Sequence, residues 1–396
     1  MARERLPVIV GLGGINGAGR ASGHHALARM TYEALPKKQR TATLDALAGL
    51  MGPEAAAGER YILDHTLIRR IESNHFDVDS VSWNQRFPTE SNGHPVNFDL
   101  ERKHLPETIP PDWVVTSSSV THVNVQIVGQ QDFLLPTHRD FEVKAAGQLP
   151  TGFEPGTLYA SRNHPRGLQM TIFAASDALG SLGIEWERIQ STVPADEISV
   201  YAGSAMGQLD PAGAGGMLSA RYNGKRVTSK YCPLSLAEMP ADFINAYVLG
   251  SMGATGATLG ACASFLYNLR MAIADIRAGR ARVAVEGSAE APINPEVMEG
   301  YAAMGALATD KELRKLDGLA DDADPDHRRA CRPFADNCGF TIAESAQVVV
   351  LCDDALAVER GASVLGAATG GLGIAVGCLK SISGPGVGSY FTRATA

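Results

Sequence analysis

The sequence predicts an α/β protein in which helices cover the faces of a β-sheet. Short apolar runs with strand character alternate with stretches that repeat apolar residues at helical spacing. Glycine clusters separate many of these segments, as in GLGGINGAG near the N-terminus. Of the 396 residues, 45% are hydrophobic and 20% are charged, so the chain can bury a large core. Together these observations predict a layered fold.

The N-terminal part opens with a strand and then becomes irregular. We expect a strand at residues 6–13, LPVIVGLG, and a helix at about residues 23–35. Prolines and histidines are frequent between residues 36 and 165. Because aromatic and aliphatic residues keep recurring there, we interpret this stretch as a folded insertion or elaboration rather than a linker.

Regular alternation returns after residue 165. GLQMTIFAASDALGSLGI predicts an amphipathic helix, EISVYAGSAMG a strand that ends in a glycine turn, and PADFINAYVLGSMG another helix. Cys262 is expected to open the next helix, because apolar residues follow it at helical spacing. ARVAVEGSAE predicts a buried strand, and NPEVMEGYAAMGAL a helix with Asn294 as its N-cap and Pro295 in its first turn.

The last segments continue the same rhythm. GFTIAESAQVVVLCD predicts two strands or one bent strand. DALAVERG predicts a helix that ends at glycine, and ASVLGAAT a further strand.

Charge and cysteine content exclude several classes of function. The formal net charge of −8 argues against nonspecific nucleic-acid binding, which needs a basic face. The six cysteines form no C-x-x-C pair, so we expect no metal site and free thiols in the cytoplasm. No segment has the pattern of a signal peptide or of a membrane span.

A glycine cluster at the N-terminus, VIVGLGGINGAGRASG, invites comparison with a dinucleotide-binding loop. Gly11 and Gly13 follow a strand, but the third glycine of a G-x-G-x-x-G pattern would fall at Asn16. The acidic residue at the expected distance, Glu33, lies inside the helix pattern instead of ending a second strand. We interpret the cluster as a tight turn.

Cys262 stands where the glycine-rich run GSMGATGATLG becomes a helical pattern. A free cysteine often acts as a small buried hydrophobe, and that interpretation serves for the other five. At the start of a helix, however, backbone N–H groups and the helix dipole favour a thiolate and can stabilise an oxyanion. This setting indicates acyl transfer through a covalent thioester.

The segment from GATLGACASFLYNLRMAIADI to GYAAMGALAT resembles the active-site region of β-ketoacyl synthases, the condensing enzymes of fatty-acid and polyketide synthesis. The resemblance extends over CRPFADNCGFTIAES and back through SVYAGSAMGQL, and covers about residues 166–368 and the first strand. GINGAGRASGHHALARM and NCGFTIAES are similar to a long-form bacterial subgroup that can initiate fatty-acid synthesis. The chain departs from the general family pattern at Ala335, Asn337 and Cys338.

The resemblance implies a thiolase-like α-β-α-β-α fold and a homodimer. It divides the chain into an N-terminal half, residues 1–360, which contains the elaboration at about 36–165, and the start of a C-terminal half, residues 361–396. It makes Cys262 the nucleophile, which accepts an acyl group from acyl-carrier protein or coenzyme A and condenses it with malonyl-acyl carrier protein. Phosphopantetheine carries the acyl groups, and no other cofactor is implied.

The resemblance also places two residues at the acyl pocket. Met206 is expected to limit its depth, which would favour short acyl chains, and Tyr301 to line it. Both residues are equally well interpreted as packing in the core.

Two histidines of the family lie downstream of the cysteine, in segments that resemble H-G-T-G-T and a later G-H. The only histidine after Cys262 is His327, in the charged run LADDADPDHRRACRP, which we interpret as a solvated loop. The chain is therefore expected to be truncated at its C-terminus and to lack both catalytic histidines.

Two other functions share this pattern. A catalytically incomplete partner subunit, like a chain-length factor, would lack the histidines, although such relatives usually lose the cysteine too. A thiolase-like enzyme that uses coenzyme A would share the fold and the nucleophile. The basic segment SARYNGKRVTSKY is a candidate docking patch for an acidic carrier protein, or an ordinary solvated loop, and its cations are Arg221, Lys225, Arg226 and Lys230.

Overall fold

A computed structural model describes residues 4–90 and 94–370 of the chain. Residues Met1–His75 and Glu142–Ala396 form one compact unit, and Phe76–Phe141 form a second. The second unit lies within the stretch 36–165 that the sequence assigned to an elaboration; the domain boundaries themselves stay a prediction.

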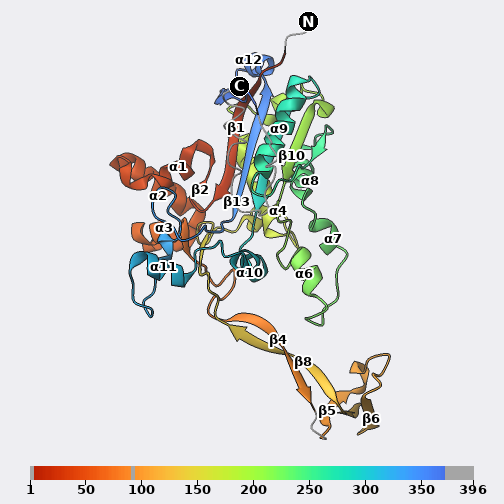
Figure 1. Ribbon diagram of the computed structural model, residues 1–396. Helices are drawn as coiled ribbons and strands as arrows, with labels where there is room; N and C mark the ends of the chain where they lie inside the picture. Colours follow the sequence, from red (N-terminus) through yellow and green to blue (C-terminus); the bar gives the residue numbers. More distant parts are fainter. Residues whose placement is uncertain (1–3, 91–93, 371–396) are drawn as a thin grey trace, which may run out of the picture. The chain divides into compact units, whose positions relative to one another are not determined.

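A mixed β-sheet forms the centre of the larger unit (Figure 1). Its strand order is β11-β10-β12-β13-β1-β14, and β2 pairs with β1. β10 runs parallel to β11 and β12, whereas β13 runs antiparallel to β12 and β1. The strands are β1 (Pro7–Asn16), β2 (Gly19–Arg20), β10 (Ile198–Gly203), β11 (Thr255–Gly256), β12 (Val283–Glu290), β13 (Ser345–Asp353) and β14 (Gly366–Ala367).

Helices α4 (Arg166–Gly180) and α9 (Ser264–Arg277) cover opposite faces of this sheet. Val283 and Val285 of β12 belong to the apolar cluster that contains Met170 of α4, whereas Ala284 between them packs with Ile276 of α9. Side chains of a strand alternate between its two faces, so each helix seals one side of the same strands. The result is one helix–sheet–helix sandwich.

The glycines of the N-terminal cluster serve helix packing. A Cβ on Gly13 would lie 2.1 Å from the backbone nitrogen of Ala178 in α4, and one on Gly11 would lie 2.9 Å from the Ala178 carbonyl oxygen. Only glycine allows the strand and the helix backbone to approach so closely. This contact accounts for the pattern without a bound nucleotide.

Other predicted helix ends are confirmed. The Asn294 side chain accepts a hydrogen bond from the backbone N–H of Val297 at 3.0 Å, with Pro295 as the first helical residue of α10 (Pro295–Ala303). Helix α12 (Asp354–Arg360) ends at Gly361, which has φ +67°. The remaining α-helices of this unit are α1 (His25–Met30), α2 (Lys37–Met51), α3 (Glu59–Asp64), α5 (Trp186–Gln190), α6 (Ala214–Ser219), α7 (Tyr231–Leu234), α8 (Met239–Ile244) and α11 (Asp310–Asp317).

Two expectations from the sequence are wrong. GFTIAESAQVVVLCD forms a single strand, β13, because residues 339–344 run outside the sheet and make only isolated bridges to Leu307 and Gly147. His327 is buried instead of solvated, and its Nε2 lies 2.9 Å from Oδ1 of Asp310, which provides the polar partner that burial requires.

The second unit contains a two-stranded ribbon, β4 (Val81–Glu90) with β8 (Gln130–Arg139), and a three-stranded sheet. The sheet has the order β5 (Val96–Glu101), β7 (His122–Ile127) and β6 (Trp113–Ser117). Alternate residues of these strands form a separate apolar core around Val123, Val125 and Ile127. The three-stranded sheet thus has an apolar core of its own.

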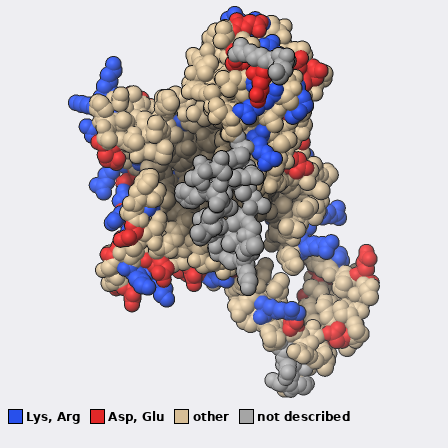
Figure 2. Space-filling view, turned by 45° about the horizontal axis from the view of Figure 1, so that its top comes forward, with Lys and Arg blue, Asp and Glu red and all other residues tan. Residues whose placement is uncertain are grey.

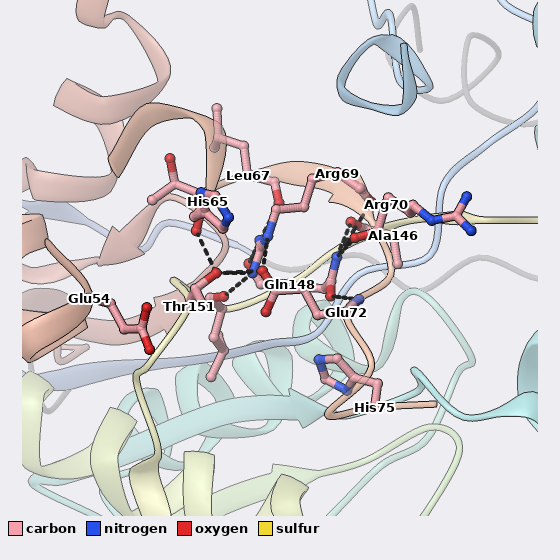
Figure 3. Close-up of polar contacts among 12 residues, drawn as sticks. Glu54, His65, Leu67, Arg69, Arg70, Glu72, His75, Ala146, Gln148 and Thr151 are labelled. Carbon is pink, nitrogen blue, oxygen red and sulfur yellow. Dashed lines mark hydrogen bonds and ion pairs between the residues drawn. The ribbon is translucent and has the colours of Figure 1, made fainter. Parts of the chain in front are cut away.

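In the larger unit, the chain leaves toward this segment and returns from it through one strand pair, β3 (Ile68–Arg70) with β9 (Ala145–Gly147). A buried polar network holds the pair (Figure 3). The Arg69 guanidinium donates to the carbonyl oxygens of Gln148 and Leu149 at 3.1 and 2.9 Å, and its Nε donates to Glu72 at 2.8 Å. Burial opposes the charge of Glu72, but the hydrogen bond and charge of Arg69 lower the pKa of this carboxyl below its usual range.

Candidate active site

Cys262 lies in a tight turn directly before helix α9. The sequence predicted that the cysteine opens this helix. The helix instead begins at Ser264, two residues after the cysteine. Ala261 has φ +50°, a left-handed conformation that is unfavourable for a residue with a side chain. The Ser264 hydroxyl closes the turn, because it donates to the Ala261 carbonyl at 2.7 Å and accepts from the Gly260 N–H at 3.0 Å.

Asn268, one turn further along α9, fixes the same turn to the sheet. Its Oδ1 accepts from the Thr258 N–H at 2.8 Å, and its Nδ2 donates to the Gly287 carbonyl of β12 at 3.1 Å. Asn268 is fully buried. The cysteine is therefore held by side-chain bonds on both sides, and its thiol is exposed at the positive end of a helix of 14 residues.

The thiol opens into an apolar cavity of about 840 Å³. Helix α6 and the turn after it form one wall, with Leu218 and Tyr222. Helix α10 and its C-cap form another, with Val297 and Met304. Phe340 lines the same space. A cavity of this size and character fits an acyl chain and the arm that carries it.

The structure brings the three residues singled out by the sequence into this one cavity. Met206 and Tyr301 both line it together with Cys262. The Tyr301 hydroxyl donates to Sδ of Met206 at 3.5 Å, and its ring meets Phe340 edge-on, with 5.8 Å between the ring centroids. Burial raises the pKa of Tyr301, and the nearby Cys262 and Glu290 raise it further, so the phenol is protonated at neutral pH.

Glu290 is a neighbour of the cavity that the sequence analysis missed. Its carboxylate accepts hydrogen bonds from the Ser204 hydroxyl at 3.0 Å, from the Ala205 N–H, and from the Met206 N–H at 3.4 Å. Burial raises the pKa of this carboxyl, although the three donors counteract that effect. A carboxylate at the end of a buried strand, where apolar residues are expected, was the available signal.

Other expected features can be compared with the described residues. No histidine is among the residues that line the cavity in this part of the chain. Within residues 4–90 and 94–370, no cluster of three or more histidine, cysteine or acidic side chains could hold a metal ion. None of the described helices is both long enough and apolar enough to cross a bilayer.

Comparisons with known proteins bear on this geometry. Residues 165–357 match the family model of the β-ketoacyl synthase N-terminal domain. The chain is 48% identical over 414 aligned positions to β-ketoacyl-[acyl-carrier-protein] synthase FabY of Pseudomonas aeruginosa. The chain belongs to the β-ketoacyl synthase family.

The crystal structure of the noncanonical ketosynthase FabY from P. aeruginosa matches the whole chain with a TM-score of 0.94 at 47% identity. The thiolase-like ketosynthase fold is therefore confirmed. The alignments cover 99% and 100% of this chain but 65% of each FabY chain. A more distant relative, 3-oxoacyl-[acyl-carrier-protein] synthase 2 of Staphylococcus aureus, is 27% identical over 205 residues, which are 52% of this chain and 46% of the relative.

The expected start of the C-terminal half, residues 361–396, falls mostly outside the described residues. Its described portion ends at residue 370 and contains β14. The sixth cysteine, Cys378, also lies outside them.

Proposed function

We propose that Cys262 is the nucleophile of a β-ketoacyl-acyl-carrier-protein synthase in fatty-acid synthesis. Its thiolate attacks the carbonyl carbon of an acyl thioester. The tetrahedral intermediate then releases the carrier thiolate, which takes up a proton to become the thiol, and leaves the acyl group on Sγ. Malonyl-acyl carrier protein next loses CO₂, and the resulting carbanion attacks the acyl carbonyl, which releases β-ketoacyl-carrier protein and the Cys262 thiolate.

The observation that carries this proposal is the exposed thiol of Cys262 between the positive end of α9 and the apolar cavity. The helix end polarises an attacked carbonyl. The cavity shields the acyl chain from water. The hydrogen bonds of Ser264 and Asn268 hold the turn around Cys262 in one conformation. A fixed turn keeps the sulfur in one orientation for attack on the substrate.

Met206 and Tyr301 are proposed to bind the acyl chain. Both are large side chains at the wall of the cavity, and they contact each other there. We propose that Met206 sets the accepted chain length and favours short acyl groups. We propose that the condensation step uses two histidines, which the resemblance places in segments that resemble H-G-T-G-T and G-H.

Acyl carrier protein is the proposed partner, with phosphopantetheine as the acyl carrier and no further cofactor. The basic segment Arg221–Lys230 supports this partner, because the Tyr222 ring of this segment lines the cavity and the neighbouring cations are exposed. Carrier proteins of this family are acidic, so opposite charges would guide the carrier to the cavity mouth. On the face that Figure 2 shows, many Lys and Arg side chains lie near Asp and Glu side chains.

We also propose that the protein is a homodimer in the cytoplasm. Apolar side chains close to Cys262 in the sequence are exposed in the single chain, namely Leu259 and Leu266. Their exposure supports coverage by another surface in the functional protein.

The test is acyl transfer to Cys262, followed by intact-protein mass spectrometry and peptide mapping. We expect acetyl-coenzyme A or acetyl-carrier protein to add one acyl group to the chain and Cys262→Ala to abolish the addition. Cys232→Ala is the matched control, since Cys232 is also exposed. An acylated Cys232 and an unmodified Cys262 would refute the assignment.

Two further measurements separate the alternatives. A strong preference for coenzyme A over carrier protein would favour a thiolase-like enzyme. A stable heterodimer with an intact synthase, without acylation, would favour a partner subunit. Reversal of Lys225 and Arg226 to glutamate should raise the Michaelis constant for the carrier several-fold in the complete protein and leave that for coenzyme A thioesters unchanged.

A further inference from the structure

We propose that Glu290 is a positioning residue that fixes Met206 and thereby sets the depth of the acyl cavity. The inference rests on the proposed function of the cavity, and it assigns a specificity role to a carboxylate that does not line the cavity itself. Glu290 is the last residue of β12, and the segment that it holds, residues 204–206, directly follows β10.

The strand register explains why the carboxylate reaches this segment. β10 and β12 run parallel, with Gly203 opposite Ser288, so both strands end at the same edge of the sheet. Beyond that edge, the carboxylate of Glu290 spans the turn. One carboxylate oxygen accepts from Ala205, and the other accepts from Ser204 and Met206.

These bonds place the backbone of Met206 but leave its side chain free to point into the cavity. The far end of that side chain is held separately, by the hydrogen bond from the Tyr301 hydroxyl to Sδ at 3.5 Å. Met206 is thus anchored at its backbone by β12 and at its sulfur by α10. Methionine has three flexible torsions, so without an anchor it would be a poor barrier to a longer chain.

The charge of Glu290 is needed for this arrangement. All three neighbours are donors, and an ionised carboxylate offers only acceptors. Its glutamine analogue would turn an NH₂ group toward at least one N–H or O–H donor, so at least one bond would be lost. The shape of the site would be nearly unchanged.

The first experiment measures acylation of Cys262 by acetyl- and octanoyl-coenzyme A and reports the ratio of octanoyl to acetyl rates. Met206→Ala removes the proposed barrier and should raise this ratio about tenfold. Glu290→Gln should raise it in the same direction. The double variant should not exceed Met206→Ala, because both changes remove one barrier.

Two variants serve as controls. Glu286→Gln is the same change in the same strand, at a residue whose carboxylate makes no hydrogen bond to residues 204–206, and it should leave the ratio within about twofold of the wild type. Glu290→Asp keeps the charge on a shorter side chain and should restore part of the wild-type ratio. An unchanged ratio in Glu290→Gln, or a double variant in which the two effects multiply fully, would overturn the proposal.

The second experiment does not depend on acyl transfer, so it separates the proposal from the proposed function. The Met206 ε-methyl group is observed by ¹³C NMR in the intact chain and assigned by its absence in Met206→Ala. Glu290→Gln should shift or broaden this signal, whereas Glu286→Gln should not. If Cys262 is never acylated, the enzymatic function fails while this result still decides the role of Glu290.

Ser204→Ala tests the same link if Glu290→Gln does not fold. It removes one of the three donors and leaves the carboxylate in place. A smaller shift of the Met206 signal in the same direction is expected. An identical signal to that of the wild type would contradict the link.

Discussion

The hydroxyl of Tyr301 on α10 lies 3.5 Å from Sδ of Met206, which follows β10. The two residues are 95 positions apart in sequence, yet they close one wall of the cavity that holds Cys262. Tyr301→Phe should keep the edge-on ring contact with Phe340 and remove only the hydrogen bond. We expect a small change in stability, below about 1 kcal/mol, and an increase in long-chain acylation smaller than that of Met206→Ala. Denaturant unfolding and the acylation ratio check both statements, and a larger effect than Met206→Ala would contradict them.

Cys262 and Cys232 are both exposed to solvent. A difference in their rates of modification would therefore reflect chemical reactivity rather than solvent access. Cys262 is at the positive end of α9, the setting in which we propose that its sulfur acts as a nucleophile. We expect iodoacetamide at pH 7 to modify Cys262 about tenfold faster than Cys232, as measured by peptide mapping over time. Equal rates at the two thiols would mean that the helix end does not activate Cys262.

Glu344 and Arg166 form a buried ion pair. Nε of Arg166 lies 2.6 Å from Oε2 of Glu344, and the carboxylate is almost fully buried. Arg166→Leu would leave this charge without its partner, so we expect a loss of about 3–5 kcal/mol in the free energy of unfolding. Arg166→Leu combined with Glu344→Leu should cost less than the single change. Urea unfolding at pH 7 measures both, and a double variant less stable than the single one would contradict this account.

The same pair predicts acid sensitivity. Burial alone would raise the pKa of Glu344, but the hydrogen bonds and charge of Arg166 outweigh it and hold the pKa below its usual range. A lowered pKa in the folded state stabilises the protein above the unfolded-state pKa of about 4.5, and this contribution is lost as pH falls through the folded-state value. Glu344→Gln should therefore be less stable than wild type at pH 7, and the difference should shrink below pH 4.5. A difference that is constant from pH 7 to pH 3 would contradict the assignment.

Glu286 presents the opposite case. Both of its carboxylate oxygens are buried without a hydrogen-bond partner among the described residues. Burial raises its pKa well above the usual range, so folding favours the protonated acid, and its stabilising contribution falls as pH rises above about 4.5. Glu286→Gln should raise stability at pH 8 by on the order of 1–3 kcal/mol and have little effect at pH 4. Thermal unfolding at the two pH values decides it, and an equal effect at both would exclude titration of Glu286.

Gly13 and Gly49 test the packing of α4 on β1. A Cβ at Gly13 would collide with the backbone of α4, whereas one at Gly49, in α2, meets nothing within 4 Å. Gly13→Ala should destabilise the protein by more than about 2 kcal/mol, and Gly49→Ala should stabilise it by about 0.5–1 kcal/mol. Midpoints of thermal unfolding for the two variants provide the measurement. Similar midpoints would show that the helix can move away from the strand.

The sequence predicted the elements whose own apolar pattern determines them. Helix α12 and strand β12 follow from local periodicity and capping residues. The start of α9 at Ser264 could not be predicted in this way, because it depends on the left-handed conformation of Ala261 and on the hydrogen bonds of the Ser264 hydroxyl. His327 was misjudged because the polar residues around it dominate the pattern, while its burial depends on Asp310 on α11.

The candidate site shows the same division. Cys262 was identifiable because its signal, glycines followed by a helix, is local. Glu290 was not, because its three partners lie 84 to 86 residues earlier in the chain and come together only when β10 pairs with β12. A residue that acts by positioning another residue, as we propose for Glu290, can be identified only once the pairing of the strands is known.

The strand pair β3–β9 has a consequence for how this chain can be cut and rejoined. Arg70 lies opposite Ala145, and the backbone N–H of Ile71 donates to the Lys144 carbonyl at 2.8 Å. The polypeptide therefore re-enters the larger unit beside the point at which it departs, and closing that gap with a short turn costs little chain entropy. Residues 76–141 could therefore be removed or replaced by another segment without changing the path of the backbone in the larger unit.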